Sequence, residues 1–457
     1  MRLLVIGGDA AGMSAASQAR RLRGPDELEI VVVERGDHTS YSACGIPYFV
    51  GGEVAGADAL VARTPAEHRE RGIILHLRHE AVEIDTGGAR VRVRDLASGG
   101  ERWEPYDHLM IATGAVPVRP DLPGVDAAGI FGVQTLDDGI AIHRAVERDR
   151  PARAVVVGSG YIGLEMAEAL VRRGIEVTIV EAGEQPMRAM DPDMGALVAD
   201  AVRGLGIHLR LDEPVEGFDT GGGRVTAVRT ARRTIPADLV VLGLGVRPGS
   251  DLARAAGIET GPTGGIVTDR RMRTRTANVW AAGDCVETRH LVSGAPVAIA
   301  LGTHANKQGR VAGTGIGGGY ATFPGVVGTA ISKICKVEVA HTGLNSRDAE
   351  RAGFDALTAT VESTTRAGYH PDATTMHTKL VFERRTGRLL GAQIVGEEGA
   401  AKRIDGLAIA LWNGMTVEEM TGLDLAYAPP FSPVWDPVLI TARKAAALVE
   451  ETMRNGG

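Results

Sequence analysis

Short apolar runs, separated by stretches that are typical of helices, recur along the first half of the chain. Residues 3–6 and 28–33 are almost entirely apolar, and the alanine-rich stretch between them reaches about Arg23. The same alternation returns as apolar runs at 154–157 and 177–180 with a helical stretch between them. Runs of this length without polar alternation are typical of strands that are buried on both faces of a parallel sheet. The pattern therefore predicts two βαβ units.

A glycine-rich turn joins the first strand of each unit to its helix, and an acid ends the second strand. Such glycines let the backbone approach a pyrophosphate, the helix N-terminus favours its charge, and the acid binds ribose hydroxyls. Asp9 occupies the middle-glycine position of the first turn, which we interpret as a tolerated departure. The two units predict two dinucleotide sites. Their candidate residues are Gly7, Gly8, Ala11, Gly12, Glu34 and Arg35 in the first unit, and Gly158, Gly160, Tyr161, Ile162, Gly163 and Glu181 in the second.

The rest of the chain contains a linker and a third region of different character. Residues 113–124 are rich in glycine and proline and predict a crossover out of the first unit, which begins at Thr113 and Gly114. The short strand expected at 278–282 is followed by Gly283 and by Asp284, a carboxylate suited to a polyol hydroxyl. From about residue 320 the pattern predicts strands at 337–341, 378–382 and 390–395 and helices near 399–413 and 436–450, without a phosphate loop.

Composition narrows the class of protein. The chain has 457 residues, of which 44% are apolar, so we expect two or three globular domains. A net charge of -7 and a pI near 6.0 argue against nucleic acid as a partner. No apolar run approaches the roughly 20 residues that span a bilayer, so we expect no membrane contact and a cytoplasmic location. No group of side chains has metal-ligand spacing, and we expect no metal.

The cysteines set the expected chemistry. Three cysteines without scaffold spacing indicate a reducing compartment with free thiols. Cys44 stands alone soon after the first βαβ unit, while Cys285 and Cys335 are distant in sequence and are interpreted as structural. A single thiol beside a two-electron cofactor has to take its redox partner from the substrate. We expect a helix that begins near Cys44 to Pro47 to place the sulfur at a positive helix end and to lower its pKa.

The two glycine turns, the segment Ala112-Thr113-Gly114 and the segment Ala282-Gly283-Asp284 together resemble the FAD-dependent pyridine-nucleotide disulfide oxidoreductases. The resemblance implies an α/β fold with two Rossmann-like domains and a C-terminal α+β dimerisation domain. It places FAD on the first turn and NAD(P)H on the second, in a homodimer. The implied domains are 1–118 with 249–319 for FAD, 119–248 for NAD(H), and 320–457 for dimerisation.

Within this family the lone Cys44 in Ser-Ala-Cys-Gly-Ile-Pro-Tyr resembles the single-cysteine branch, which includes coenzyme A disulfide reductases and NADH oxidases or peroxidases. Tyr369 and Tyr427 match two tyrosines that the coenzyme A disulfide reductases bring to the active site from the partner subunit. The oxidases and peroxidases carry a histidine in the first glycine turn, where this chain has Ala10. The resemblance thus favours an NADH-dependent reductase of coenzyme A disulfide that uses the same thiolate on persulfides or polysulfides.

Further residues receive expected roles. Glu165 faces the nicotinamide if the family geometry holds, and Glu181 favours NADH over NADPH because a carboxylate repels a 2′-phosphate. Arg188, seven residues after Glu181, is the side chain that could offset this repulsion. Coenzyme A carries several phosphate charges, so its site is expected to offer arginines. The candidates for substrate binding are Ser14, Gln18, Arg20, Arg21, Arg23, Ser40 and His304.

Two other functions stay open. An NADH oxidase would cycle Cys44 through a sulfenic acid. A redox-sensing flavoprotein would keep both nucleotide sites and give Cys44 no turnover role. Basic residues at the end of a helix are also stabilising without any ligand, which is the alternative for the arginines after the first helix.

Overall fold

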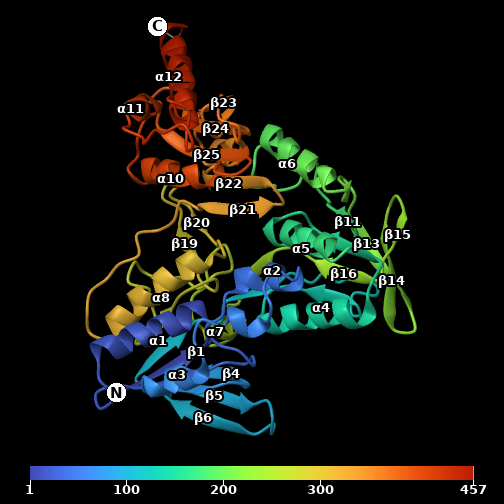
Figure 1. The fold of residues 1–457 in the computed structure, drawn as a ribbon. Coiled ribbons are helices and arrows are strands. Elements are labelled where there is room, and N and C mark those ends of the chain that lie inside the picture. The colour runs from blue at the N-terminus through green and yellow to red at the C-terminus, as the bar shows by residue number, and fades with distance from the viewer. Residues whose placement is uncertain (456–457) are drawn as a thin grey trace.

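The first sheet is built from apolar runs that lie far apart in the chain. Its five strands follow the order β18-β7-β1-β2-β3, and all of them pair in parallel. The structure is a computed structural model that describes residues 1–455, and Figure 1 shows its arrangement. The strands are β1 (Arg2–Ile6), β2 (Glu29–Val33), β3 (Ile73–His76), β7 (His108–Ile111) and β18 (Val279–Ala281).

Two long helices pack closely against each other over this sheet. Gly309 and Gly313 of α8 let it touch the backbone of α1, since a Cβ at either position would lie 2.2 or 2.3 Å from the carbonyl oxygens of Ala11 and Ala15 (Figure 1). A small antiparallel sheet packs into the same core through Ile84 and its neighbours. The elements are α1 (Ala10–Leu22), α8 (Gly302–Ile316), α3 (Pro65–Glu70), α7 (Asp251–Ala255), β4 (His79–Asp85), β5 (Arg90–Asp95) and β6 (Glu101–Pro105).

The second sheet repeats the parallel arrangement in the order β12-β11-β10-β16-β9. Helices cover one face, and a three-stranded antiparallel sheet packs on the other through a separate apolar cluster. The elements are β9 (Ile130–Gly132), β10 (Arg153–Val157), β11 (Glu176–Val180), β12 (His208–Arg210), β16 (Leu239–Leu242), α4 (Leu136–Asp149), α5 (Tyr161–Arg172), α6 (Pro192–Gly204), β13 (Val215–Gly221), β14 (Arg224–Thr230) and β15 (Thr234–Pro236).

The chain passes between these two units through two adjacent strands. β8 (Ala115–Pro117) leads out of the first sheet, β17 (Val246–Pro248) leads back, and the two pair antiparallel. We propose that the domain boundaries near residues 118 and 249 follow from this crossing pair. The return of the chain explains why β18 completes the first sheet.

The third region is an antiparallel sheet of order β21-β22-β25-β24-β23 with helices packed on it. The predicted strands form its centre, whereas the edge strands β21 and β23 were not predicted. None of the helices among residues 1–455 is long and apolar enough to cross a membrane. The elements are β21 (Ala330–Ile334), β22 (Val337–Gly343), β23 (Ala356–Thr364), β24 (Thr375–Glu383), β25 (Leu389–Gly396), α9 (Ser346–Arg351), η3 (Ala401–Arg403), α10 (Ile404–Trp412), α11 (Val417–Thr421) and α12 (Pro437–Asn455).

A buried ionic cluster joins the third region to the second unit. The ammonium of Lys379 in β24 lies 2.9 Å from Asp191 and 2.7 Å from Asp193 at the start of α6. Asp191 also accepts hydrogen bonds from the backbone and the hydroxyl of Ser346, at 2.9 and 2.7 Å. Lys379 and Asp191 are 6% and 2% exposed, so both charges depend on each other for compensation.

Replacing Lys379 by Met is expected to destabilise the protein by about 3 to 5 kcal/mol, because it leaves Asp191 buried without a counter-charge. The same substitution at Lys402, whose pair with Asp405 is on the surface, is expected to cost about 0 to 1 kcal/mol. Denaturant-induced unfolding followed by circular dichroism compares the two variants. Equal, small losses would show that the cluster does not hold the two regions together.

Candidate active site

Cys44 lies in a short turn, η1 (Ala43–Gly45), that continues directly into α2 (Ile46–Val50). The helix buries Ile46, Phe49 and Val50 in the core of the second unit, although the segment leaves the first unit. Gly45 packs on Leu60, where a Cβ would lie 2.3 Å from a side-chain carbon. Cys44 itself is exposed and free. The thiol is therefore accessible on a segment that is fixed between both units.

The expectation that α2 lowers the pKa of Cys44 is wrong for this structure. Although Cys44 is exposed at the surface, partial burial of its thiol group raises the pKa, and the negative charges of Glu165 and Asp284 act in the same direction. The helix that follows has only five residues, and the causes that raise the pKa prevail. The polypeptide around Cys44 thus favours the thiol over the thiolate. Both carboxylates therefore act on the electrostatics of the thiol.

The first glycine turn has the shape of a phosphate cradle. Gly7 has φ +103, and a Cβ there would lie 2.1 Å from the carbonyl oxygen of Ala112. Gly12 is equally constrained, since its Cβ would lie 1.9 Å from the carbonyl oxygen of Gly7. The carboxylate of Glu34 accepts a hydrogen bond of 2.7 Å from the amide of Gly8. These contacts fit the dinucleotide that the turn predicts.

Asp9 is accommodated because its carboxylate is directed to the backbone. It accepts a hydrogen bond of 3.2 Å from the amide of Tyr41, in the segment that leads to Cys44. Burial raises the pKa of Asp9 to about 6, and Glu34 and Asp284 add to this shift. Burial likewise raises the pKa of Asp284 to about 6. Both carboxyls are part of the same site as the glycine turn.

The remaining predicted residues of the first site lie at the ends of its strands. Gly283 has φ +85, and its amide donates to the side chain of Gln308 at 2.8 Å. The hydroxyl of Thr113 donates to the carbonyl oxygen of Gly249 at 2.6 Å, and Gly114 has φ +66. Thr113 and Gly114 therefore lie where the chain leaves and re-enters the first unit. Arg35 is exposed after β2.

The second glycine turn repeats this geometry. A Cβ on Gly158 would lie 2.4 Å from the carbonyl oxygen of Gly243, and one on Gly163 would lie 2.2 Å from that of Gly158. Gly160, at the N-cap of α5, has no atom within 4 Å of its Cβ position and leaves open space above the helix. Tyr161 stacks on His341 at 6.0 Å, and Ile162 is 36% exposed.

Glu165 on α5 connects this turn to the thiol. Its carboxyl accepts a hydrogen bond of 2.9 Å from Ser332 in β21. Burial raises the pKa of Glu165, while the bond from Ser332 opposes the shift. One turn later, Glu168 accepts a bond of 2.8 Å from the amide of Cys335. The hairpin of β21 and β22 is thus bonded to α5 at two positions one turn apart.

The ribose end of the second site contains an acid and an arginine. Glu181 accepts hydrogen bonds from the amide and hydroxyl of Ser159, at 2.9 and 2.6 Å, and from the amide of Gly183 at 2.8 Å. The Cβ position of Gly183 lies 3.2 Å from the carboxylate of Glu181 and 3.3 Å from the side chain of Arg188. Arg188 also lines a pocket of about 420 Å³ together with Arg347.

The candidates for binding an anionic substrate are not equally available. Arg20 donates to the carbonyl oxygens of Gly72 and of Arg23, and Arg23 donates to Gly317 and pairs with Glu27. These two arginines stabilise the C-terminal end of α1, which fits the alternative that they have a structural role and bind no ligand. Arg21 is exposed, and its guanidinium donates to the side chain of Gln18 at 3.2 Å. The hydroxyl of Ser14 donates to Asn306 at 2.7 Å.

The other two substrate-binding candidates have buried surroundings. Ser40, with φ +49, hydrogen-bonds His68 at 3.0 Å, and burial lowers the pKa of His68 to about 4. His304 packs edge-on against Phe323, and burial lowers its pKa. His68 and Ser332 were missed by the sequence analysis. Neither belongs to a motif, and only the fold brings them to Ser40 and Glu165.

Tyr369 and Tyr427 come together on the surface of the third region. A hydrogen bond with Tyr427 raises the pKa of Tyr369, which places the two phenols near each other. They are 77% and 48% exposed in the single chain. Both phenols therefore lie on the solvent-exposed surface of the single chain.

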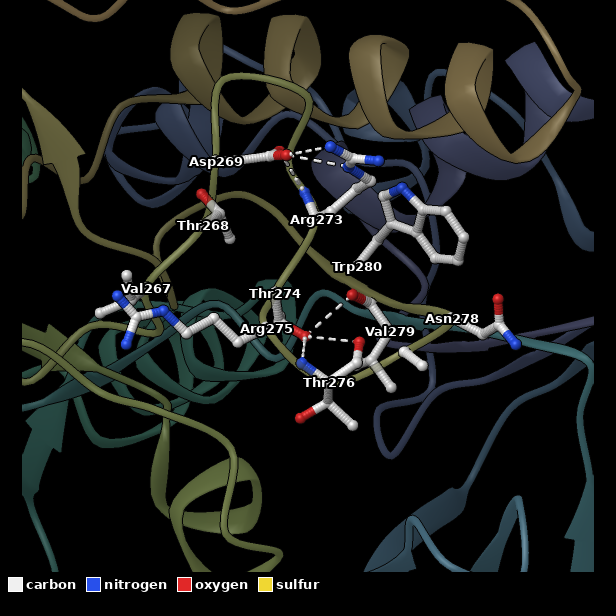
Figure 2. A pocket seen from close by; sticks show the side chains of 11 residues that line it. Val267, Thr268, Asp269, Arg273, Thr274, Arg275, Thr276, Asn278, Val279 and Trp280 are labelled. Atoms are coloured by element: carbon white, nitrogen blue, oxygen red, sulfur yellow. Dashed lines mark hydrogen bonds and ion pairs between the residues drawn. The ribbon is translucent and has the colours of Figure 1, made fainter.

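A hollow of about 570 Å³ near β18 is separate from this site (Figure 2). Asp269 and Arg273 pair across it at 2.7 Å, and the hydroxyl of Thr274 donates to the carbonyl oxygens of Thr276 and Val279. Arg275, which also lines it, pairs with Glu259 outside the hollow at 2.9 Å. The hollow is lined by none of the predicted site residues. We assign it no role in the chemistry.

Comparison with known proteins identifies the family. Residues 1–309 match the pyridine nucleotide-disulphide oxidoreductase family, and residues 329–437 match its dimerisation domain. The chain belongs to this family, which confirms the predicted family and fold class. FAD and NAD(P)H are the cofactors of the family, and the two glycine turns described above fit them.

Individual relatives span nearly the whole chain. The "NAD(P)H sulfur oxidoreductase (CoA-dependent)" of Pyrococcus abyssi is 41% identical over 96% of this chain and 97% of its own. The solved NAD-dependent persulfide reductase from A. fulgidus is 40% identical with a TM-score of 0.95, and the match covers 100% of this chain and 84% of that one. A relative named coenzyme A disulfide reductase (Staphylococcus haemolyticus) is 30% identical over 98% of this chain and 100% of its own. A relative named NADH oxidase (Methanocaldococcus jannaschii) is 36% identical over 97% of this chain and 98% of its own.

Replacing Glu165 by Gln is expected to shift the alkylation of Cys44 to lower pH, because it removes a negative charge that disfavours the thiolate. The rate of iodoacetamide labelling, followed by mass spectrometry of the peptide that contains Cys44, gives the midpoint. Glu168→Gln is the control, since Glu168 lies on the same helix and is paired with Arg172. A shift of equal size in both variants, or none in Glu165→Gln, would contradict the described electrostatics.

Proposed function

We propose that the protein is an NADH-dependent flavoprotein reductase of coenzyme A disulfide, which acts on persulfides or polysulfides through the same thiol. The observation that carries this proposal is Cys44, a free and exposed thiol. Its segment is bonded to Asp9 of the first glycine turn through Tyr41 and continues into a helix that packs in the core of the second unit. A thiol without a protein partner exchanges with a disulfide from solution. Relatives named for coenzyme A-dependent sulfur reduction and for coenzyme A disulfide reduction support the substrate class.

The exchange has two balanced steps at Cys44. The Cys44 thiolate attacks one sulfur of the disulfide, forms a mixed disulfide with coenzyme A, and releases the other half as a thiolate that takes a proton. When bound, NADH and FAD together supply the two electrons that cleave the mixed disulfide, which regenerates the Cys44 thiolate and releases the second thiol. Because the surroundings of Cys44 favour the protonated thiol, a group that accepts its proton promotes the first step.

We propose that Tyr369 and Tyr427 of the partner subunit hydrogen-bond or protonate the leaving sulfur. Their high exposure and mutual contact support a role on a surface that a second copy covers. The dimerisation domain that carries them supports the same arrangement. Arg21, Gln18 and Ser14, on the exposed side of α1, are the proposed contacts for the phosphates of coenzyme A.

An NADH oxidase that cycles Cys44 through a sulfenic acid is the second candidate. Relatives named NADH oxidase support it. Ala10 argues against it, because the first glycine turn then offers no imidazole beside the sulfur. Comparing anaerobic turnover of coenzyme A disulfide with oxygen consumption in its absence separates the two functions.

Replacing Cys44 by Ser is expected to lower NADH-dependent reduction of coenzyme A disulfide by at least about 1000-fold, because a hydroxyl cannot form the mixed disulfide. The variant is expected to retain FAD, since Cys44 is not part of either glycine turn. Anaerobic assays monitor NADH at 340 nm, and the flavin spectrum is the control for folding. Cys335→Ser is expected to retain activity, and turnover by Cys44→Ser would eliminate the scheme.

The proposed preference for NADH rests on Glu181, and Arg188 is expected to permit weaker use of NADPH. Arg188→Gln should raise KM for NADPH roughly 10-fold, the value of one hydrogen bond to a charged group, and leave KM for NADH unchanged. Steady-state kinetics with both nucleotides measure this. Arg203→Gln on α6 is the control, and tighter use of NADPH than NADH by the wild type would overturn the preference.

A further inference from the structure

The two tyrosines of the proposed active site are carried by segments that lie far apart in the chain. Tyr369 is in the loop between β23 and β24, which is closed by a bond of 2.9 Å from the amide of Thr365 to the carbonyl oxygen of Thr374. Tyr427 precedes α12 in a turn where the amide of Phe431 donates to Ala428 at 2.9 Å. Contact between the phenols therefore depends on how these segments are held together.

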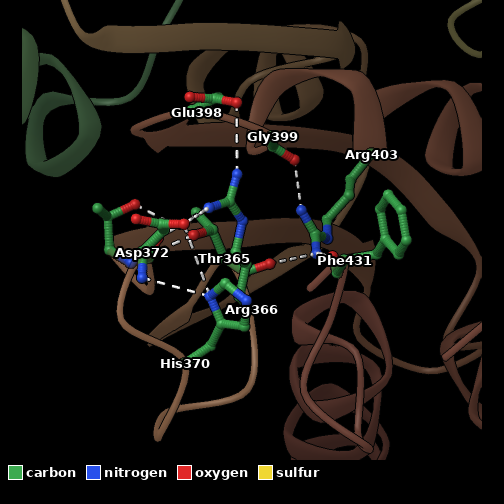
Figure 3. Close-up of polar contacts among 9 residues, drawn as sticks. Thr365, Arg366, His370, Asp372, Glu398, Gly399, Arg403 and Phe431 are labelled. Atoms are coloured by element: carbon green, nitrogen blue, oxygen red, sulfur yellow. Dashed lines mark hydrogen bonds and ion pairs between the residues drawn. The ribbon is translucent and has the colours of Figure 1, made fainter. Parts of the chain in front are cut away.

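Arg403, at the end of η3, lies between the two segments and bonds both (Figure 3). A single nitrogen, Nη2, donates to the carbonyl oxygen of Thr365 at 2.8 Å and to that of Phe431 at 2.7 Å. Each of these carbonyls is four residues away from one of the tyrosines. The two segments are also joined directly by a hydrogen bond of 3.1 Å from the amide of Ala367 to the carbonyl oxygen of Pro429. The planar guanidinium adds a second link, which restricts how the loop of Tyr369 and the turn of Tyr427 can move relative to each other.

The other nitrogen atoms of Arg403 anchor it in place. Nε donates to the carboxylate of Asp436 at 3.0 Å, and Nη1 donates to the carbonyl oxygen of Gly399. Asp436 is held by the hydroxyl of Ser432 at 3.0 Å and by the amide of Val438 at 2.9 Å. The side chains of Arg403 and Asp436 are only 13% and 12% exposed, which limits competition from water.

Arg366, on the loop of Tyr369, has a different set of contacts. It pairs with Asp372 and Glu398, both at 3.3 Å, and these two carboxylates are 70% and 84% exposed. Figure 3 shows Arg366 beside His370 and Asp372 and Arg403 beside Phe431. Arg366 therefore joins the loop of Tyr369 to the exposed Glu398, whereas Arg403 bridges the segments of the two tyrosines.

We propose that Arg403 is a positioning residue for thiol exchange: it aligns Tyr369 and Tyr427 as a pair before they meet the thiol of the partner subunit. The proposal rests on the function proposed above. Lysine cannot fully replace Arg403, because an ammonium lacks the planar fork of nitrogen atoms that bonds the carbonyl oxygens of Thr365 and Phe431 and the carboxylate of Asp436 at the same time. A displacement of about 1 Å between reacting groups costs up to roughly 100-fold in rate.

The test uses three variants, each as the FAD-loaded dimer. They are Arg403→Lys, the tyrosine variant with Tyr369→Phe and Tyr427→Phe, and the triple variant that combines all three substitutions. Arg403→Lys is expected to lower kcat for coenzyme A disulfide about 10- to 100-fold, with the rate of flavin reduction by NADH unchanged. The triple variant should be no slower than the tyrosine variant, because both act on the same step. Arg366→Lys, the matched control, is expected to change kcat less than about 2-fold.

Each outcome supports or overturns the proposal. Multiplicative losses in the triple variant, wild-type kcat in Arg403→Lys, or an equal loss in Arg366→Lys would overturn it. If Arg403→Lys does not form an FAD-loaded dimer, Asp436→Asn takes its place. Asp436→Asn is expected to lower kcat less than Arg403→Lys would, and to cause no further loss of kcat when it is added to the tyrosine variant. A wild type that does not reduce coenzyme A disulfide at all would instead refute the proposed function.

Discussion

The position of Cys44 depends on the burial of the short helix that follows it. Ile46, Phe49 and Val50 lie in the core of the second unit, while the segment before them is bonded to the glycine turn of the first unit through Asp9 and Tyr41. The thiol is consequently held on a segment that is fixed to both nucleotide-binding units. Burying these three side chains contributes several kcal/mol, enough to keep the connection ordered. The rest of the proposed chemistry follows from this placement.

The electrostatics around the thiol oppose negative charge. Asp9, Asp284 and Glu165 all have raised pKa values, chiefly because of burial, and Glu165 and Asp284 also raise the pKa of Cys44. Such perturbed groups gather at sites that bind and react. A thiolate in these surroundings is costly, which gives a physical reason for proton donors and acceptors, such as the tyrosine pair, near the sulfur. Because Glu165 lies on the helix that follows the second glycine turn, its charge also couples the protonation of the Cys44 thiol to that nucleotide site.

The parts of the fold that could be predicted from the sequence are the repeated βαβ units and the glycine motifs. Both parallel sheets follow from apolar runs, and the glycines at 7, 12, 158 and 163 follow from contacts that leave no space for a Cβ. The edge strands β21 and β23 were missed because edge strands have fewer apolar positions. The pKa of Cys44 was predicted in the wrong direction, since burial and Glu165 depend on tertiary packing. Ser332, His68 and Arg403 act through contacts across more than 25 positions, which no local pattern indicates.

The central claim is that Cys44 takes its redox partner from solution as a mixed disulfide. Mass spectrometry of the protein after anaerobic incubation with coenzyme A disulfide, before NADH is added, tests it most directly. The account predicts one coenzyme A on the peptide that contains Cys44, and its release as free thiol after NADH is added. An unmodified Cys44, or an adduct found only at Cys335, would contradict the account.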